Sequence, residues 1–275
     1  VCSTSNNKEV RLLIQDHLLP YIKVTSLLAK FGEDFRLQAS LNSRVYASFS
    51  IPQAITGRMS SSNPNMQNIP RKGQGSLCRA LFTASSGCKL VKADLAQIEL
   101  VAFAYLSNNR TMIDCLEQGV DLHRRTAAAL LNKEISVVTS EDRTLAKAFN
   151  FGLLFGMQSA AFVENTLKNY NISLTLEQAD IYRERWLDTY PGIREIHKEW
   201  LAYVGENRII RTACGKTRQW DAATDYLNEC LNHPIQGTAA EMLKLAVVTA
   251  HDKLLTINSH IVNLVHDEIV VDSPV

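Results

Sequence analysis

Residues 143–156 read RTLAKAFNFGLLFG, and this stretch is the starting point for the fold and the chemistry of the chain. Four of its residues are spaced four apart: Arg143, Lys147, Phe151 and Phe155. On a helix they follow one face, which drifts by about 40° per step. The cationic start of that face suits a phosphate chain, and its aromatic end could hold a sugar and stack on a base. The alternative is a partly buried helix with core phenylalanines and solvated cations.

Signals on either side of this stretch indicate where helices begin and end. Thr139 to Asp142 reads as a capping box that opens a long helix, and Thr175 with Gln178 opens another, which the Tyr-Pro-Gly run at 190–192 closes. Gly152 and Gly156 each follow a phenylalanine. Because glycine costs about 1 kcal/mol inside a helix, these two indicate the close approach of another group or a moving helix.

Two separated acids end apolar segments that read as strands. Asp94 follows the strand-like run Lys89–Ala93 at a junction with a helix, and residues 260–272 (HIVNLVHDEIVVD) favour a hairpin with His266, Asp267 and Glu268 at its tip. If the strands pair, Asp94 and Asp267 meet at one edge, where two Mg²⁺ ions about 3.5–4 Å apart could act on phosphate oxygens. The alternative is that each acid is a solvated strand end or a helix cap.

The rest of the chain is helical with two further irregular regions. We expect a helix over 8–31 interrupted at Pro20, a strand over 44–51, a long functional loop over 56–75, helices between 108 and 231, and a helical stretch to 256 broken near Pro234 and Gly237. Residues 208–220 read as a small basic hairpin turning at Cys214 and Gly215. Strands, a helical block and strands again predict an α+β fold with a helical insertion in a sheet domain.

Composition excludes several classes. The chain has 275 residues, 46% apolar and 21% charged, which excludes disorder and collagen-like repeats. Its net charge of 29 − 28 = +1 gives no global basic field. Six separated cysteines without zinc spacing and the lack of an 18-residue apolar run or a signal peptide favour a reduced, cytosolic protein. The start at Val1 and the stop at Val275, just after a strand-like run, suggest that both ends are cut.

Read together, five segments resemble family A DNA polymerases, the class of bacterial DNA polymerase I and its phage relatives. The residues that carry the resemblance are KADLAQIEL at 92–100 (motif A), RTLAKAFNFGLLFG at 143–156 (motif B), VHDEI at 265–269 (motif C), TGRMSSSNPNMQNIP at 56–70 and HPIQGTAAEMLKLA at 233–246. The resemblance covers residue 25 to the end. It implies a right-hand architecture with an antiparallel palm sheet, a large helical fingers insertion and a truncated thumb.

The family's domains carry over as ranges of this chain. Residues 1–40 would be a thumb remnant, 41–100 and 256–275 a palm whose second part is truncated, and 101–255 the fingers. The implied activity is transfer of a dNMP from dNTP to a primer 3′-OH with release of pyrophosphate. The implied partners are primer-template DNA and dNTPs, with no membrane, in a monomer that serves DNA replication or repair.

The resemblance also assigns site residues. Asp94 and Asp267 would hold two Mg²⁺ ions with the backbone carbonyl of Leu95, and Glu268 would be an accessory catalytic acid. The implied nucleotide-binding residues are His123, Arg143, Lys147, Phe151, Phe155, Gln97 and Glu99. Lys147 would also donate a proton to the departing pyrophosphate, and Glu99 would exclude a ribose 2′-OH.

The implied DNA contacts lie near the growing end of the primer, through backbone and minor-groove acceptors that every base pair offers. They are Arg58, Asn65, Asn68, Gln236 and His266. Three departures from the family pattern involve four residues, namely Leu95 with Ala96, Val101, and Phe155 in place of a tyrosine. We expect stacking at Phe155 without the hydrogen bond that a hydroxyl would make to Glu99. Phe151 predicts poor use of dideoxynucleotides.

Other functions remain open at this point. One is a catalytically incompetent fragment that binds primer-template but does not extend it. Another is a single-subunit RNA polymerase, which shares the two acids and a basic helix but not Glu99 within QIEL followed by an Asn-Phe-Gly run. A nuclease would also use carboxylates and metals, yet the N-terminal region lacks a DxE arrangement of further acids.

Overall fold

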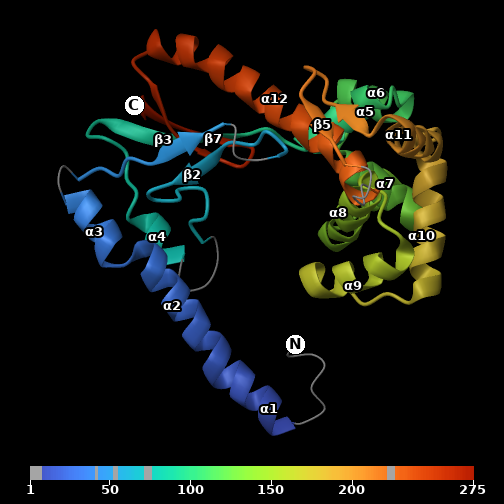
Figure 1. The fold of residues 1–275 in the computed structure, drawn as a ribbon, viewed down its shortest axis with the longest axis horizontal. Coiled ribbons are helices and arrows are strands. Elements are labelled where there is room, and N and C mark those ends of the chain that lie inside the picture. The colour runs from blue at the N-terminus through green and yellow to red at the C-terminus, as the bar shows by residue number, and fades with distance from the viewer. Residues whose placement is uncertain (1–7, 41–42, 52–54, 71–75, 222–226) are drawn as a thin grey trace. The chain divides into compact units, whose positions relative to one another are not determined.

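The structure is a computed structural model that describes residues 8–40, 43–51, 55–70, 76–221 and 227–275 (Figure 1). The chain divides into two compact units. The first comprises Val1–Ala54, Met59–Asp94 and Val247–Val275, and the second comprises Ile55–Arg58 and Leu95–Ala246. Both helix and antiparallel sheet are present, so the predicted mixture of elements is confirmed.

A three-stranded antiparallel sheet organises the first unit. Its order is β3 (Cys88–Asp94), β7 (Glu268–Pro274) and β6 (His260–Val265), so the last two strands form the predicted hairpin (Figure 1). The pairing register sets Asp94 opposite Glu268. Glu268 therefore begins β7 and does not belong to the hairpin tip, which consists of His266 and Asp267.

Apolar residues of β6 and β7 fix the packing of this sheet. Leu264, Val265, Ile269 and Val271 are buried, whereas nearly all of β3 is exposed. Asp272 is also buried, and its carboxylate accepts hydrogen bonds from the backbone N–H and the hydroxyl of Ser85. The segment before β3 is thereby anchored to β7, since a buried carboxylate requires such donors.

A second sheet, of two strands, differs from the strand and the loop predicted for this region. The strand expected over 44–51 is only β1 (Ser48–Ser50), and it pairs antiparallel with β2 (Ser60–Ser62). The expected loop over 56–75 therefore contains a strand, although three consecutive serines are not a sequence signal for a strand. Residues 71–75 of that loop lie outside the described residues.

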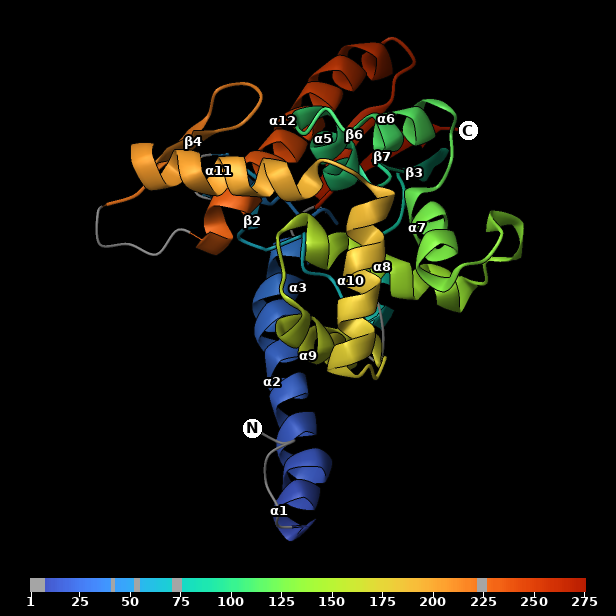
Figure 2. The same ribbon diagram turned by 90° about the vertical axis from the view of Figure 1, so that its right-hand side faces the viewer.

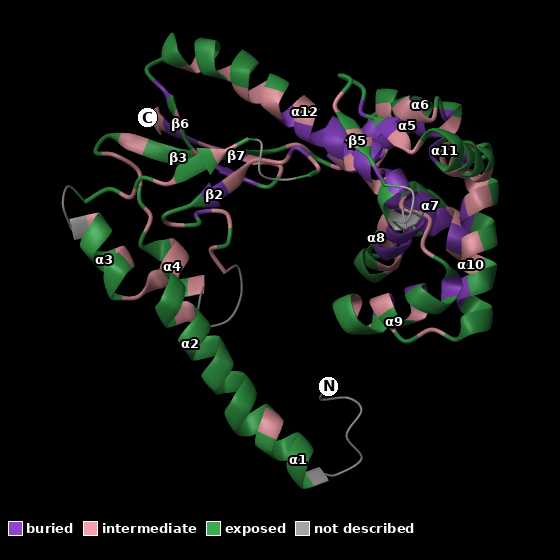
Figure 3. Ribbon diagram, in the orientation of Figure 1, coloured by how far each residue is buried: buried purple, intermediate pink, exposed green. Residues whose placement is uncertain are grey.

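The N-terminal helices contribute few buried residues to the core. They are α1 (Lys8–Leu13), the π-helical turn η1 (Ile14–Leu18), α2 (Leu19–Phe31), α3 (Glu33–Ser40) and, further along the chain, the short α4 (Leu77–Ala80). The predicted interruption near Pro20 takes the form of η1, which runs directly into α2, and Pro20 is the second residue of α2. No residue of η1 or α2 is buried, and exposed residues dominate this region in Figure 3.

The second unit is mostly helical, as predicted. Its helices are α5 (Ile98–Leu106), α6 (Arg110–Glu117), α7 (Leu122–Leu131), α8 (Ser140–Leu154), α9 (Ser159–Tyr170), α10 (Leu176–Thr189) and α11 (Ile193–Asn207), with a 3₁₀ turn η3 (Ile135–Val137). Capping boxes at Thr139 with Asp142 and at Thr175 with Gln178 confirm the predicted starts of α8 and α10. Helix α10 packs on α7, α8 and α9 (Figure 2).

The core of this unit lies where these helices meet. Its largest fully buried side chains include Phe103, Phe149, Phe162, Trp186 and Tyr190. The rings of Phe149 and Phe162 lie 3.8 Å apart between centroids, which holds α9 against α8. Figure 3 shows buried residues in α5, α7 and α8 and in the first part of α12.

The predicted basic hairpin is confirmed as β4 (Ile209–Arg211) and β5 (Thr217–Gln219). Its turn docks on α12 (Leu227–Leu255), because the backbone N–H groups of Ala213 and Cys214 donate to the side chains of Thr238 and Glu241. A Cβ on Gly237 would lie 2.3 Å from a methyl carbon of Thr212. Only glycine allows the hairpin to approach the helix this closely.

The predicted break of this last helix is wrong. Helix α12 is continuous and contains Pro234. His233, Pro234 and Ile235 are all buried, so packing on both sides outweighs the local cost of the proline. Residues up to Ala246 belong to the second unit and residues from Val247 to the first.

Two further findings concern the described residues as a whole. None of their helices combines the length and the apolar content needed to cross a membrane. The cysteines at 78, 88, 115, 214 and 230 form no disulfide, and Cys2 lies outside the described residues.

Candidate active site

The candidate metal-binding acids lie at one end of the three-stranded sheet. Asp94 is the last residue of β3 and faces Glu268 in the register, and Asp267 is the neighbour of Glu268 in the turn. The predicted meeting of Asp94 and Asp267 at one sheet edge is therefore confirmed for the backbone. Asp94 is exposed and Asp267 half-buried.

The chemistry of these acids fits a Mg²⁺ site that takes some of its ligands from a substrate. Lys92 approaches Glu268 at 3.8 Å, whereas Asp94 and Asp267 form no ion pair within the described part of the chain. The described residues also contain no group of three or more acids, histidines or cysteines that could enclose a metal. Mg²⁺ is commonly held by one or two carboxylates together with water and phosphate oxygens, which matches two available aspartates.

The motif over 56–70 borders the same sheet. The side chain of Gln67 donates to the carbonyl of Leu264 at 3.3 Å, and Asn263 donates to the carbonyl of Met66 at 3.4 Å. Met66 is buried, so the segment is fixed in place by one apolar anchor and two hydrogen bonds. Asn65 and Asn68, two predicted DNA contacts, are exposed on this anchored segment.

His266 occupies the hairpin turn next to Asp267. It is exposed and has a left-handed backbone with φ of 55°. A residue other than glycine in this region is uncommon and costs free energy, and such residues often occur at functional sites. The turn presents the side chain of His266 to solvent.

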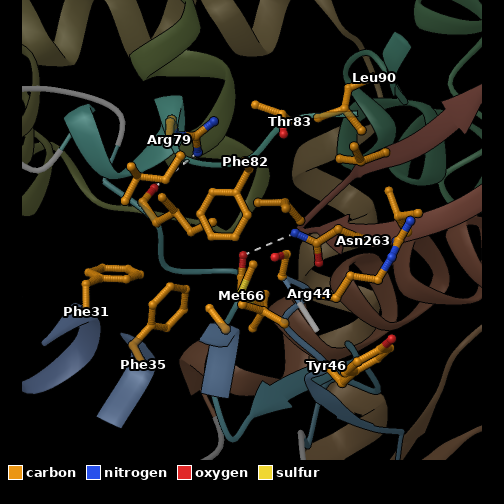
Figure 4. A pocket seen from close by; sticks show the side chains of 18 of the residues that line it. Phe31, Phe35, Arg44, Tyr46, Met66, Arg79, Phe82, Thr83, Leu90 and Asn263 are labelled. Carbon is orange, nitrogen blue, oxygen red and sulfur yellow. Dashed lines mark hydrogen bonds between the residues drawn. The ribbon is translucent and has the colours of Figure 1, made fainter. Parts of the chain in front are cut away.

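A cavity of about 1100 Å³ in the first unit is lined by Glu268 and by residues on several other segments (Figure 4). Aromatic rings in edge-to-face contact line one wall, namely Phe31, Phe35 and Phe82. Arg79 is also in the lining, and its guanidinium donates to the carbonyls of Ile69 and Pro70. Asp94 and Asp267 do not line this cavity.

In the second unit, two predicted site residues bind one another. A guanidinium N–H of Arg58 donates to Oε1 of Glu99 at 2.7 Å, and Glu99 is buried to 8% exposure at the start of α5. Gln97 directly precedes this helix with a left-handed φ of 56°. Its Oε1 is buried and has no hydrogen-bond partner among the described residues. Gln97 and Glu99 thus share one helix start.

The residues predicted to hold a triphosphate gather on α7 and α8. His123 lies in the first turn of α7, where the N-cap residue Asp121 accepts hydrogen bonds from the backbone N–H groups of His123 and Arg124. The His123 and Phe151 rings lie 5.8 Å apart, and Nζ of Lys147 is also 5.8 Å from the Phe151 ring centroid. The structure therefore brings His123, Lys147 and Phe151 together.

Asp121 adds a contact that the sequence did not predict. Nε of Arg143 donates to its Oδ2 at 2.7 Å, so one carboxylate both caps α7 and binds α8. Partial burial favours protonation of Asp121, but the hydrogen bonds from Arg143 and His123 outweigh it and lower the pKa of this carboxyl. Arg143 is thereby held near the N-terminus of α8, 37% exposed and able to contact an anion.

The end of α8 differs from the predicted pattern. The helix ends at Leu154, so Phe155 is its C-terminal cap and Gly156 lies outside it with φ of +74°. The prediction that Gly156 is a costly interior glycine is wrong, because this position requires a left-handed backbone that glycine adopts freely. Gly152 is inside the helix, and a Cβ there would lie 2.9 Å from the ring of Phe162. The predicted close approach is confirmed at Gly152.

Gln236, the remaining predicted DNA contact, is half-buried on α12 beside Gly237.

The buried polar residues near His123 were not predicted. Asn150, Thr126, Trp186 and Tyr190 are all fully buried and hydrogen-bonded to one another or to His123. The available signal was Asn150 itself, a polar residue among the apolar positions of α8.

Comparisons with known proteins define the class. The fold matches that of the polymerase domain of Pol1 from M. smegmatis, solved in complex with DNA primer-template and dNTP, with a TM-score of 0.81 at 27% identity over 95% of this chain and 47% of that one. The sequence model of DNA polymerase family A matches residues 4–275. The chain belongs to the family A DNA polymerases.

Individual relatives agree with this assignment. The chain is 39% identical to DNA polymerase I of Aquifex aeolicus (strain VF5) over 84% of its own length and 39% of that protein. It is 30% identical to DNA polymerase I of Pseudomonas aeruginosa (strain PAO1) over 98% of its own length and 31% of that protein. The chain therefore spans less than half the length of these curated relatives.

Proposed function

We propose that this chain performs template-directed DNA synthesis, transferring a dNMP from dNTP to the 3′-OH of a primer and releasing pyrophosphate. The observation that carries the proposal is the placement of Asp94 and Asp267 at one end of the sheet, in a chain that belongs to the family A DNA polymerases. Phosphoryl transfer depends mainly on positioning and on stabilising charge. The two aspartates would position the metal ions, and the cationic residues of α7 and α8 would stabilise the charge on the phosphates.

We propose that the metal is Mg²⁺, two ions held by Asp94, Asp267 and the backbone carbonyl of Leu95, with Glu268 as an accessory acid. Bound metal ions would polarise the phosphate and favour the ionised form of the attacking hydroxyl. Asp94 and Asp267 carry no competing ion pair within the described residues, so both can serve as ligands.

The residues of α7 and α8 would bind the incoming nucleotide. Arg143 and Lys147 supply positive charge to the triphosphate, and His123 supplies a hydrogen bond. Lys147 would also donate a proton to the departing pyrophosphate. Phe151 would pack on the sugar and Phe155 would stack at the template position. In α8 the two cations lie nearer the N-terminus than Phe151, and Phe155 follows as the C-terminal cap, which supports this division.

Glu99 would exclude ribonucleotides by occupying the space of a 2′-OH, with Gln97 beside it at the nucleotide. Arg58, Asn65, Asn68, Gln236 and His266 would contact primer and template. The exposure of Asn65, Asn68 and His266 supports contacts with a large partner. Glu99 is buried and held by Arg58, which supports a fixed steric role.

We assign residues 1–40 to the thumb, 41–100 and 256–275 to the palm, and 101–255 to the fingers. The three-stranded sheet with its acids supports the palm assignment. The cationic pair of helices α7 and α8 supports the fingers assignment. We further propose that the protein acts as a monomer in the cytoplasm.

Primer extension tests the function. The chain, a labelled primer-template, dNTPs and Mg²⁺ should give extended primer, and a chelator should stop the reaction. Asp267→Asn should lower the rate about 10³-fold or more, because several kcal/mol of charge stabilisation depend on the metal. Asp252→Asn, which alters an exposed acid of α12, is the matched control and should extend normally.

Each alternative has its own result in this assay. DNA binding without extension by the wild-type chain would favour a binding fragment. Release of single nucleotides from the primer without dNTPs would favour a nuclease. Equal incorporation of ribonucleotides and deoxyribonucleotides would favour an RNA polymerase.

A further inference from the structure

The side-chain amide of Asn150 has only one chemically sensible orientation. Asn150 is fully buried in α8, and its Oδ1 lies 2.7 Å from Nε1 of Trp186 and 2.9 Å from Oγ1 of Thr126. An indole N–H can only donate, so the amide atom that faces Trp186 must be the oxygen. Oδ1 then accepts two hydrogen bonds, and the NH₂ group points the other way.

That orientation determines where His123 carries its proton. Nδ2 of Asn150 lies 2.8 Å from Nδ1 of His123. Since an amide NH₂ only donates, Nδ1 must be the acceptor and cannot carry a proton. A neutral imidazole has one N–H, which therefore sits on Nε2.

The surroundings of His123 keep the ring neutral. His123 is 2% exposed, and this burial lowers its pKa to about 4 despite the nearby Asp121 carboxylate. The cations Arg143 and Lys147 of α8 also disfavour a charged ring. Within the described residues Nε2 has no hydrogen-bond partner, so its proton remains available to a ligand.

We propose that Asn150, oriented by Trp186, is a positioning residue that holds His123 as the Nε2–H tautomer, so that this N–H donates to a phosphate oxygen of the bound nucleotide. The proposal rests on the proposed nucleotide site of α7 and α8. The opposite tautomer would present a lone pair to the phosphate and repel it. The neutral N–H donor makes a directional hydrogen bond to the phosphate oxygen, in a site where Arg143 and Lys147 supply the positive charge.

The contacts behind Asn150 make this arrangement rigid. Thr126 lies on α7 and Trp186 on α10, so two helices that pack on α8 hold the amide. The hydroxyl of Tyr190 lies 2.7 Å from Oγ1 of Thr126 and continues the network. All of these side chains are buried, and breaking one contact would leave a buried polar atom without a partner.

NMR of the protein without nucleotide tests the tautomer directly. In ¹⁵N-histidine-labelled wild type at pH 7, correlations between ring nitrogens and carbon-bound protons should show His123 protonated on Nε2. His197, whose Nε2 lies 3.1 Å from the carbonyl of Leu154, must also donate from Nε2 and is the internal reference. Asn150→Asp should place a proton on Nδ1 of His123 and leave His197 unchanged. A proton on Nδ1 in the wild type would overturn the proposal.

Nucleotide kinetics test whether Asn150 acts through His123. Asn150→Ala should raise the KM for dNTP about tenfold, the equivalent of one hydrogen bond to a charged group. In the His123→Gln background, where an amide N–H replaces the imidazole and has no tautomer, the same change should alter KM less than twofold. Equal fold-changes in both backgrounds would show a merely structural role and overturn the proposal.

A second variant covers the case in which Asn150→Ala does not fold. Trp186→Phe retains most of the ring but removes the indole N–H that orients the amide, so the NMR spectrum should show a mixture of tautomers at His123. An unchanged pure Nε2–H signal would refute the role of Trp186. If wild type extends no primer, the proposed function fails, whereas the NMR result on the free protein still decides the tautomer.

Discussion

The guanidinium of Arg58 donates to the carboxylate of Glu99 at 2.7 Å, which ties the segment Ile55–Arg58 to the first turn of α5 within the second unit. The carboxylate is nearly buried, with 10% of the side chain exposed, whereas the Arg58 side chain is 36% exposed. Glu99 therefore has a defined position. A side chain held in this way is suited to excluding a substituent from a fixed place.

Glu99→Ala should reduce discrimination against ribonucleotides by roughly 10- to 100-fold, since it frees the space that a 2′-OH requires. Glu99→Gln, which has nearly the same size, should retain most of the discrimination although it weakens the contact with Arg58. The ratio of kcat/KM for deoxyribonucleotide and ribonucleotide, measured for each variant, checks this prediction. Equal selectivity in wild type and Glu99→Ala would rule out a steric gate.

Gly152→Ala should destabilise the second unit by about 1–3 kcal/mol. The new Cβ would lie 2.9 and 3.0 Å from two ring carbons of Phe162, and that ring is buried against Phe149. Urea unfolding of the variant against wild type measures the loss. In a Phe162→Leu background the same glycine change should cost less, because the smaller side chain leaves space, and a cost equal in both backgrounds would contradict the steric explanation.

Stability should fall between pH 6.5 and about 4 because of two buried histidines. Burial lowers the pKa of both His123 and His197 to about 4. Over this range the unfolded chain binds protons that the folded chain does not, so lowering the pH favours unfolding by up to about 1.4 kcal/mol per pH unit for each residue.

The urea midpoints at pH 7 and pH 5 check this effect. His197 faces the Leu154 carbonyl and Arg183. His197→Gln removes the contribution of this histidine to the pH dependence. The variant should therefore lose less stability than wild type between the two pH values. His251→Gln, at an exposed position of α12, is the control. An identical drop for wild type and His197→Gln would show that His197 does not titrate in this way.

Phe151 predicts a preference for nucleotides that have a 3′-OH. Phe151→Tyr places a hydroxyl at the ring edge, where it can take the place of the missing 3′-OH of a dideoxynucleotide and raise its incorporation. The ratio of dideoxynucleotide to deoxynucleotide incorporation in primer extension measures this. Efficient dideoxy termination by wild type would contradict the prediction, and Phe149→Tyr, in the core, serves as a comparison that should not shift the ratio.

The sequence predicted those features that depend on nearby residues. The hairpin around Asp267 and the strand that ends at Asp94 follow from alternating and β-branched residues, and the caps Thr139 and Thr175 follow from spacing alone. The four-residue spacing likewise predicted that Arg143 and Lys147 lie on one helix, which is α8. Each of these signals lies within about one element.

Features that depend on distant contacts were missed or wrong. Helix α12 continues through Pro234 because buried neighbours stabilise it, and β2 exists because β1 pairs with it. The partners of Asn150 lie 24 and 36 residues away on two other helices. A propensity or a spacing rule contains no information about such partners.

The pairing of Asp94 with Glu268 sets a limit on how this chain can change length. Seven consecutive residue pairs, from Cys88 with Pro274 to Asp94 with Glu268, share one register. One residue inserted within β7 would shift the partners and turn the following side chains to the other face of the sheet. If the residues after the insertion kept their partners on β3, Glu268 and Asp267 would be displaced from Asp94, although every acid would still be present. The length of β7 is therefore as strict a requirement as the presence of Asp94 and Asp267.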